Sequence, residues 1–292
     1  MMSHEFDISV LLATRGRTDT LERSVRSVFE LAERPDRTKI LLAFDRDDHL
    51  GVTFFTQTLR PWMENSDIAY RAMLFDRLGY SRLNQYYNAL APHTDSEWLI
   101  VWNDDAVMET PAWDSAIMQY SGQFRLLAFH THRDHPYSIF PILPRRWYEL
   151  TGHISPHPSQ DAWLSQQAYI LDIWQRIPVE VTHDRYDLTG NNPDSTFQER
   201  EIFEGNPQDP RDFHSVEMQN LRYQDCYKLA AYLRDVAGHD MTFFENVFNG
   251  TQDPWEKLAR NDVNQQMTQF ADPHPEATCA FINNLESKHV RL

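Results

Sequence analysis

The sequence predicts an α/β fold in which a mainly parallel sheet is flanked by helices and followed by a helical C-terminal extension. Short apolar runs alternate with segments whose apolar residues recur at helical spacing, and this alternation is typical of parallel sheets with helices on both faces. Several runs end in polar clusters, which is where open sheets of this class bind ligands. A long amphipathic segment at residues 216–236 indicates the helical extension.

The first half of the chain contains four predicted strands, each a short apolar run bounded by polar residues. They lie at residues 8–13, 39–44, 70–75 and 98–102. After the first strand, Leu21, Val25 and Val28 recur at helical spacing, and Thr18 or Asp19 is the expected N-cap. A second helix is expected at residues 81–90.

The second half of the chain continues the alternation and then becomes helical. We expect helices at residues 112–120 and 161–173, the latter capped by Ser159, and strands at residues 124–129 and 179–182. A loop-dominated wall at 130–158, a mobile loop or linker at 190–210, the amphipathic helix at 216–236 and helical pieces from 242 onward complete the prediction. Residues 1–204 are accordingly assigned to the α/β domain and 205–292 to the extension.

Composition limits the classes of function. The chain has 292 residues, and its formal net charge of −16 disfavours a broad hold on nucleic acid or anionic membrane, because such contacts need clustered Lys and Arg. No apolar run approaches the length that spans a bilayer, and the N-terminus lacks the pattern of a secretion signal. Cys226 and Cys279 are in no metal-binding spacing. We therefore expect a soluble cytoplasmic protein with no stable membrane insertion.

The polar cluster after the fourth predicted strand carries the strongest functional signal. Asn103, Asp104 and Asp105 follow the apolar run directly. Carboxylates at the carboxyl end of a buried strand suit Mg²⁺ or Mn²⁺ that holds a phosphate. The alternative is an acidic turn without a ligand, since Asn and Asp are ordinary turn residues.

Several segments together resemble one family. They are ISVLLATRGR at residues 8–17, the strand ending at Asp45, SRLN at 81–84 with Asn88 on the same helix, WNDDAV at 102–107, and TPAW at 110–113. Over roughly residues 7–190 the chain resembles the GT-A glycosyltransferases, specifically the large inverting family typified by bacterial sugar transferases. The resemblance implies a nucleoside diphosphate sugar as donor and an acceptor hydroxyl on a glycan, lipid, protein or modified nucleobase.

The resemblance also assigns residues to the donor. It implies that Thr14, Arg15, Arg17 and Asp45 bind the nucleotide, and an arginine fork can pair with diphosphate oxygens or stack on a base. Arg82 and Asn84 would contact the sugar phosphate. The alternatives are solvated loop residues for the arginines, a cap for Asp45, and helix-start residues for Arg82 and Asn84.

The family's metal motif is Asp-x-Asp, and this chain departs from it with Asn103 at the first position. The resemblance makes Asp105 the metal ligand, places Asn103 and Asp104 beside the donor, and offers His183 as a second ligand for Mn²⁺ or Mg²⁺. A divalent ion would stabilise the charge that develops on the leaving diphosphate. The alternative for His183 is a surface histidine.

An inverting transfer needs a base that removes the proton of the attacking hydroxyl. By resemblance this base lies at the start of a helix after the acceptor wall, where Asp161 stands. The alternative for Asp161 is a first-turn carboxylate that only favours the helix dipole.

A second motif competes with this interpretation. His130, His132, Asp134 and His135 form the spacing of the metallo-β-lactamase-like hydrolases, which hold two zinc ions. That fold places the motif after a β-rich, glycine-rich first half, whereas this chain has 9 Gly in total. Zinc hydrolysis is the second hypothesis, and a non-catalytic carbohydrate- or nucleotide-binding relative of the GT-A fold is the third.

Overall fold

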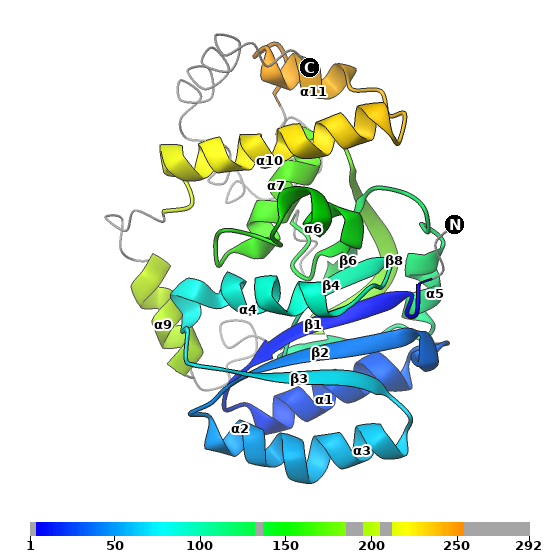
Figure 1. The fold of residues 1–292 in the computed structure, drawn as a ribbon, viewed down its shortest axis with the longest axis vertical. Helices are drawn as coiled ribbons and strands as arrows, with labels where there is room; N and C mark the ends of the chain where they lie inside the picture. The colour runs from blue at the N-terminus through cyan, green and yellow to red at the C-terminus, as the bar shows by residue number, and fades with distance from the viewer. Residues whose placement is uncertain (1–3, 132–136, 185–194, 205–211, 254–292) are drawn as a thin grey trace.

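A single mixed sheet forms the centre of the protein (Figure 1). The structure is a computed structural model that describes residues 4–131, 137–184, 195–204 and 212–253. Within them the sheet has eight strands in the order β3-β2-β1-β4-β7-β6-β8-β5. The strands are β1 (Ile8–Thr14), β2 (Thr38–Asp45), β3 (Ala69–Phe75), β4 (Trp98–Asn103), β5 (Ala106–Met108), β6 (Leu126–Thr131), β7 (Ile142–Pro144) and β8 (Trp174–His183).

Helices cover the sheet and one end of the molecule. They are α1 (Thr18–Glu30), α2 (His49–Phe54), α3 (Arg60–Asn65), α4 (Leu83–Leu90), α5 (Trp113–Met118), α6 (Arg145–Thr151), α7 (Gln160–Ile170), α9 (Ser195–Glu204), α10 (Val216–Asp235) and α11 (Thr242–Phe248). Short turns of 3₁₀ or π helix are η1 (Pro35–Arg37), η2 (Phe55–Leu59), η3 (Tyr80–Arg82) and η4 (Ala91–His93). Figure 1 shows α10 and α11 at one end of the molecule and α2 and α3 at the other.

The half of the sheet that the first four strands form is parallel, as predicted. In the register, Thr14 of β1 pairs with Phe44 of β2, and Ala13 pairs with Asn103 of β4. The carboxyl ends of these strands therefore lie at one edge. The other half is mixed, because β7 runs antiparallel to both β4 and β6, and β5 runs antiparallel to β8.

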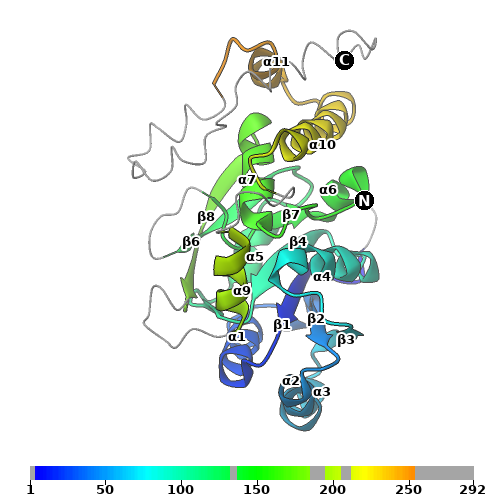
Figure 2. The ribbon, with the colours of Figure 1, turned by 90° about the vertical axis from the view of Figure 1, so that its left-hand side faces the viewer.

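The alternation of side chains along β1 explains why the sheet has two cores. Val10 and Leu12 pack with α1 on one face, while Leu11 packs with α4 and α7 on the other. Figure 2 shows α1 and α4 on opposite sides of the sheet. Because neighbouring residues of a strand point to opposite faces, a strand buried on both sides is apolar throughout, and this is why the strands were visible as continuous apolar runs.

Several predicted elements differ from those observed. The predicted wall at 130–158 contains β7 and α6, and the predicted linker at 190–210 contains α9. Pro144 ends β7, and its φ of −64° suits the residue that directly precedes α6. The helical run of α2 and α3 was not predicted. Strand β5 was not predicted either, because it has three residues and is stabilised by pairing with β8.

Of the two predicted helix caps, the one of α1 is wrong and the one of α7 is confirmed in its position. Arg17, rather than Thr18 or Asp19, precedes α1, and Thr18 is already helical. Ser159 does precede α7, but its side chain makes no capping hydrogen bond. Its backbone N–H donates instead to Nδ1 of His157, at 3.0 Å. A neighbouring ring thus fixes the chain just before α7.

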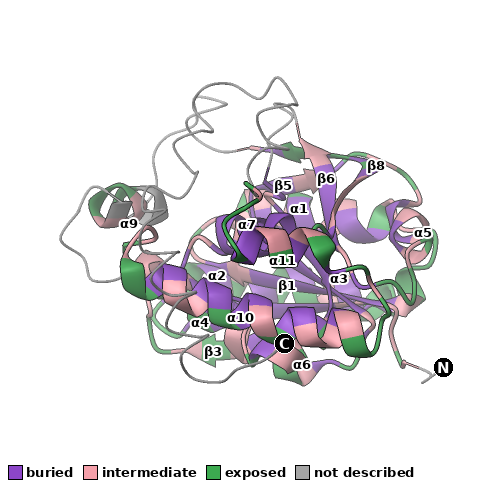
Figure 3. Cartoon of the chain, turned by 90° about the horizontal axis from the view of Figure 1, so that it is seen from above, coloured by how far each residue is buried: buried purple, intermediate pink, exposed green. Residues whose placement is uncertain are grey.

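The C-terminal helices share the core of the α/β domain. Cys226 and Leu229 of α10 are fully buried in the same cluster as residues of β1 and α7. On the same helix Asp225, 2% exposed, accepts a hydrogen bond from Gln167 and lies 2.7 Å from Nε2 of His153. Helix α7 is itself almost wholly buried and contacts both α10 and α11 (Figure 3). The predicted domain boundary between residues 204 and 205 stays a prediction. No helix in the described part of the chain is long and apolar enough to cross a membrane.

Candidate active site

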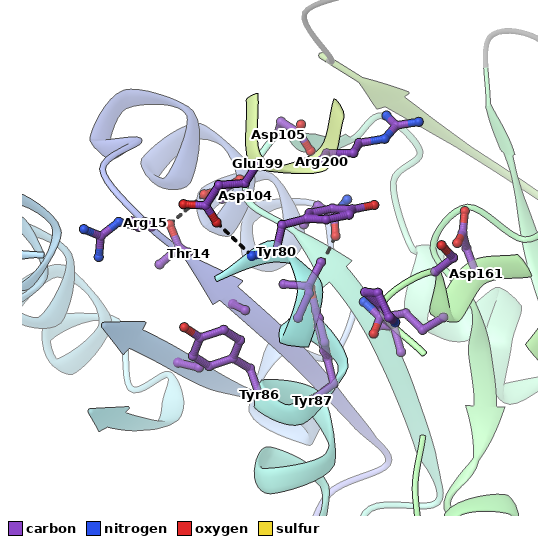
Figure 4. Close-up of a pocket in the computed structure, with 18 of the residues that line it drawn as sticks. Thr14, Arg15, Tyr80, Tyr86, Tyr87, Asp104, Asp105, Asp161, Glu199 and Arg200 are labelled. Carbon is purple, nitrogen blue, oxygen red and sulfur yellow. Dashed lines mark hydrogen bonds between the residues drawn. The ribbon is translucent and has the colours of Figure 1, made fainter. Parts of the chain in front are cut away.

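A cavity of about 310 Å³ opens where β1, β2 and β4 end. It is the meeting point that the parallel register requires, because the polar residues after each strand are brought to one edge. Nine of the eleven residues predicted from the sequence line this cavity, and Figure 4 labels several of them. The lining includes these predicted residues: Thr14, Arg15, Arg17, Asp45, Asn103, Asp104, Asp105, Asp161 and His183.

Asp104 is held on both oxygens. Thr14 Oγ1 donates to its Oδ2 at 2.7 Å, and Arg17 Nη1 donates to its Oδ1 at 2.9 Å. The two donors come from the end of β1 and from the loop before α1, which the pairing of β1 with β4 brings beside Asp104. The Asp104 carboxylate is therefore held in one orientation at the wall of the cavity, with a hydrogen bond to each of its oxygens.

Asp105 differs from its neighbour because its buried Oδ1 accepts no well-formed hydrogen bond from the described residues. Its Oδ1 is buried and makes no hydrogen bond within the described residues, while Nε2 of His183 lies 3.3 Å away. Pairing of β5 with β8 sets this distance, because Ala106 is the register partner of His183. An orphaned carboxylate oxygen beside an imidazole nitrogen fits the ligand set of a divalent ion such as Mn²⁺.

Protein ligands alone would not complete a metal site here. Groups of three or more His, Cys, Asp or Glu positioned for a metal are absent from the described residues. Mg²⁺ and Mn²⁺ sites of phosphate-transferring enzymes often use one or two protein ligands and take the rest from substrate phosphate and water. The pair of Asp105 and His183 fits that mode, whereas a catalytic zinc site needs three protein ligands.

Burial separates the protonation behaviour of the two carboxylates. Burial raises the pKa of Asp104 to about 6, and the neighbouring charge of Asp105 adds to this rise against the opposing effect of Arg17 and Thr14. For Asp105 burial acts in the same direction, but the contact with His183 and the charge of Arg17 outweigh it and lower its pKa. Asp105 is thus the more readily ionised of the two, as a metal ligand must be.

The other end of the cavity is built around Asp45. Arg15 Nη1 donates to Asp45 Oδ2 at 2.9 Å, and the hydroxyl of Tyr86 on α4 donates to Oδ1. Arg15 also makes two hydrogen bonds with Asp47, so its guanidinium is fixed in one orientation. This cluster presents a buried carboxylate and a planar cation to a ligand, the groups that suit N–H donors and acceptors on a base edge.

Asn103, the departure from the family motif, has a structural partner. Its Oδ1 lies 3.3 Å from the hydroxyl of Tyr87, which also donates to the backbone oxygen of Trp102 at 3.0 Å. Tyr87 is buried, and its burial raises the pKa of its hydroxyl well above the ordinary value. A neutral acceptor therefore meets a neutral donor beside two buried carboxylates.

Asp161 faces the cavity from its opposite side, across from Thr14 and Arg15 (Figure 4). It stands in the first turn of α7. The segment leading to it is pinned by α4, because Asn84 Nδ2 and Asn88 Nδ2 both donate to the backbone oxygen of Ser155, at 3.0 and 2.9 Å. The position of Asp161 therefore depends on a helix that also carries Tyr86 of the Asp45 cluster.

The structure does not bring every predicted donor residue to the cavity. Asn84 is 6% exposed and its amide is directed to Ser155, while Arg82 is exposed and its Nε donates to the backbone oxygen of Leu78 at 3.1 Å. Neither lines the cavity. Of the competing motif, His130 lies in β6 and does not line the cavity, and His132, Asp134 and His135 lie outside the described residues.

Helix α9 supplies lining that the sequence analysis missed. Glu199 Oε2 accepts the backbone N–H of Tyr80 at 2.9 Å, as Figure 4 shows, and Glu199 also pairs with Arg77. Gly79 makes this approach feasible, because it adopts φ +72° and an added Cβ would lie 3.0 Å from Glu199 Oε2. Arg200 then reaches the lining beside the acidic pair. In the sequence, Leu78-Gly79-Tyr80 before a helix is the local pattern at this place, and it does not indicate that Glu199 contacts it.

Comparison with solved structures identifies the fold. The mannosyltransferase PcManGT from Pyrobaculum calidifontis, solved with GDP-Man and Mn²⁺, matches with a TM-score of 0.51 and 12% identity, over 98% of this chain and 88% of that one. TarS residues 1–349 of S. aureus, solved with UDP-GlcNAc, matches with a TM-score of 0.58 and 10% identity, over 96% and 89%. The protein has a GT-A-like fold.

That result confirms the fold predicted by resemblance, and the resemblance to nucleotide-sugar transferases extends over nearly the whole chain. No family model matches the sequence, and neither does any curated protein. The zinc-hydrolase hypothesis expected a β-rich first half, and the structure instead has parallel strands alternating with helices there. The fold therefore removes the scaffold on which that hypothesis depended.

Proposed function

We propose that this protein is a metal-dependent inverting glycosyltransferase, which moves a sugar from a nucleoside diphosphate sugar to an acceptor hydroxyl. One arrangement supports the proposal most: Asp105 and His183, 3.3 Å apart, line the same cavity as Asp161. A leaving group and an attacking hydroxyl on opposite faces of one sugar carbon are what inversion requires.

The two ends of the cavity bind different parts of the donor, the base at one end and the diphosphate at the other. Asp45, oriented by Arg15 and Tyr86, accepts an N–H of the base, and Arg15 gives the base a cationic edge. Asp105 and His183 would hold Mn²⁺ or Mg²⁺, which when bound stabilises negative charge on the departing diphosphate. Thr14 keeps Asp104 in place beside it, where its carboxylate faces the ribose and phosphate.

Asp161 acts on the acceptor in this proposal. Its carboxylate takes the proton from the acceptor hydroxyl as the hydroxyl oxygen forms the new bond to the anomeric carbon and the bond to the diphosphate oxygen breaks. A first-turn position at the start of α7 gives the carboxylate a defined direction, because the neighbouring residues of α7 are buried. The walls beside it, Tyr137, Ile139 and Pro158, would contact the acceptor.

The test compares three single variants in donor hydrolysis and nucleotide binding. We expect Asp105→Ala to lose metal-dependent nucleotide binding and about 100-fold or more in turnover. Asp161→Ala should bind the nucleotide like wild type and lose about 100-fold or more in turnover, because it does not touch the donor diphosphate. Asp114→Asn serves as the control, since Asp114 is a buried acid on α5 that does not line the cavity.

Two outcomes would contradict the proposal. Unchanged turnover in both Asp105→Ala and Asp161→Ala would remove the site assignment. Nucleotide binding by wild type without hydrolysis or transfer on any tested acceptor would favour a non-catalytic relative of the fold. Metal analysis of the purified protein gives a further check, because about two tightly bound zinc ions would support the hydrolase instead.

A further inference from the structure

The guanidinium of Arg17 occupies the space between the two acidic residues. Its Nη1 lies 2.9 Å from Asp104 Oδ1 and 3.2 Å from Asp105 Oδ2. Both carboxylates are largely buried, at 5% and 7% exposure, while the Arg17 side chain is 24% exposed. The positively charged Arg17 guanidinium is therefore already in contact with Asp105, the carboxylate that best fits a metal.

The charges of this group depend on what is bound. Two carboxylates and one guanidinium carry a formal charge of −1, so a divalent ion added alone would leave the group positive beside an arginine. Like charges at such short separations repel strongly in a partly buried site. A diphosphate brings the negative charge that lets the arginine and the metal coexist.

Asp104 and the loop before Arg17 each have a contact that does not depend on the Arg17 side chain. Thr14 donates to Oδ2 of Asp104 at 2.7 Å, an oxygen other than the Oδ1 that faces Arg17. The backbone before Arg17 is fixed separately, because the N–H of Gly16 donates to Asp48 Oδ2 at 2.8 Å. A change of rotamer at Arg17 would therefore not require this loop to move.

We propose that Arg17 makes metal binding conditional on nucleotide binding. In the nucleotide-free protein its guanidinium competes with a divalent ion for Asp105; when the diphosphate enters, the guanidinium pairs with phosphate oxygens and releases Asp105 to the metal. This inference rests on the proposed function for the identity of the nucleotide. It assigns Arg17 a positioning role toward the metal as well as a binding role toward the donor, and the two ligands strengthen each other's binding.

The test measures Mn²⁺ binding directly, by electron paramagnetic resonance of free Mn²⁺, in the full chain without nucleotide and with UDP or GDP. Arg17→Gln should bind Mn²⁺ more tightly than wild type without nucleotide, by about tenfold, a coupling of ordinary size between two sites. The strengthening of Mn²⁺ binding by nucleotide should shrink by a similar factor. Arg17→Lys retains a positive charge and should stay closer to wild type than Arg17→Gln.

Arg26→Gln is the matched control, because it removes one positive charge from α1 at a position that pairs with Glu22 and Glu30 and does not line the cavity. Its Mn²⁺ affinity should match wild type. Circular dichroism spectra and thermal midpoints establish that each variant is folded.

The outcomes separate this inference from the proposed function. Nucleotide-free Mn²⁺ binding that Arg17→Gln leaves unchanged or weakens would overturn the competition, even if the protein transfers sugars. Tighter Mn²⁺ binding by Arg17→Gln, with no effect of UDP or GDP in either protein, would overturn the coupling and count against the nucleotide proposed for this cavity.

Discussion

Hydrogen bonds join α4 to the segment before Asp161, and the loss of stability on removing them can be worked out from the contacts. Asn88 Oδ1 accepts the backbone N–H groups of Ile154 and Ser155, at 2.7 and 3.3 Å, and its Nδ2 donates to the backbone oxygen of Ser155. Ile154 and Ser155 are 1% and 0% exposed. Asn88→Ala would therefore leave two buried N–H groups without their partner.

Leaving a buried donor unsatisfied costs about 1–3 kcal/mol, and one of these two bonds is long, so we expect Asn88→Ala to lower the free energy of unfolding by about 2–4 kcal/mol. For a chain of this size that corresponds to a fall in the melting temperature of about 4–15 °C. Asn84→Ala is the matched comparison, because the Ser155 oxygen keeps its bond from Asn88. Its loss should be about 1 kcal/mol.

The same hydrogen bonds should also affect the rate of catalysis. Because Ser155 leads directly to the turn that carries Asp161, a displaced segment should lower kcat by about 10–100-fold while KM for the donor changes little. Urea unfolding and steady-state kinetics on both variants measure the two effects. Equal stability of Asn88→Ala and Asn84→Ala would refute this reasoning, as would a change confined to the donor KM. A raised donor KM in Asn84→Ala alone would support the contact with the sugar phosphate that the resemblance gives Asn84.

Three further predictions test other parts of the site. Gly79→Ala should destabilise the protein by about 1–3 kcal/mol in thermal unfolding, because φ +72° is strained for alanine and the Cβ would approach Glu199; an unchanged melting temperature would contradict the docking of α9. Tyr86→Phe removes a donor to Asp45 and should weaken nucleotide binding in calorimetry about fivefold or more, whereas equal affinity would exclude Asp45 from the base site. Asp114→Ala should lower stability by about 2–4 kcal/mol with kcat and KM unchanged, since its carboxylate accepts the N–H groups of residues 33 and 34, both at 2.8 Å; altered kinetics would show that this acid reaches the site.

The parts of the fold that the sequence predicted are those whose signal is local. The apolar runs that became β1, β2 and β4 are buried on both faces, so each is visible without knowledge of its neighbours. The same holds for α10, whose length makes its pattern clear. Short elements such as β5 and β7 have three residues each and are stabilised by pairing, which a local pattern does not reveal.

The candidate site divides in the same way. Asp104, Asp105 and Asp161 were singled out because acidic residues at strand ends and helix starts stand out in a sequence, and the fold brings them to one cavity. The contact of Arg17 with Asp104 joins residues 87 positions apart, and the one between Tyr80 and Glu199 joins residues 119 apart. Such contacts follow from strand order and helix docking, so motifs and residue spacing in the sequence could not predict them.

Calorimetric titration of the full chain with UDP and with GDP, each with and without Mn²⁺, tests the central claim most directly, because it asks whether the cavity binds a nucleoside diphosphate through a metal. We predict that one of the two nucleotides binds with a stoichiometry of about one, that Mn²⁺ strengthens its binding about tenfold or more, and that Asp105→Ala abolishes this strengthening. No binding of either nucleotide with Mn²⁺ present, or binding that Asp105→Ala and Asp45→Ala both leave intact, would contradict the account.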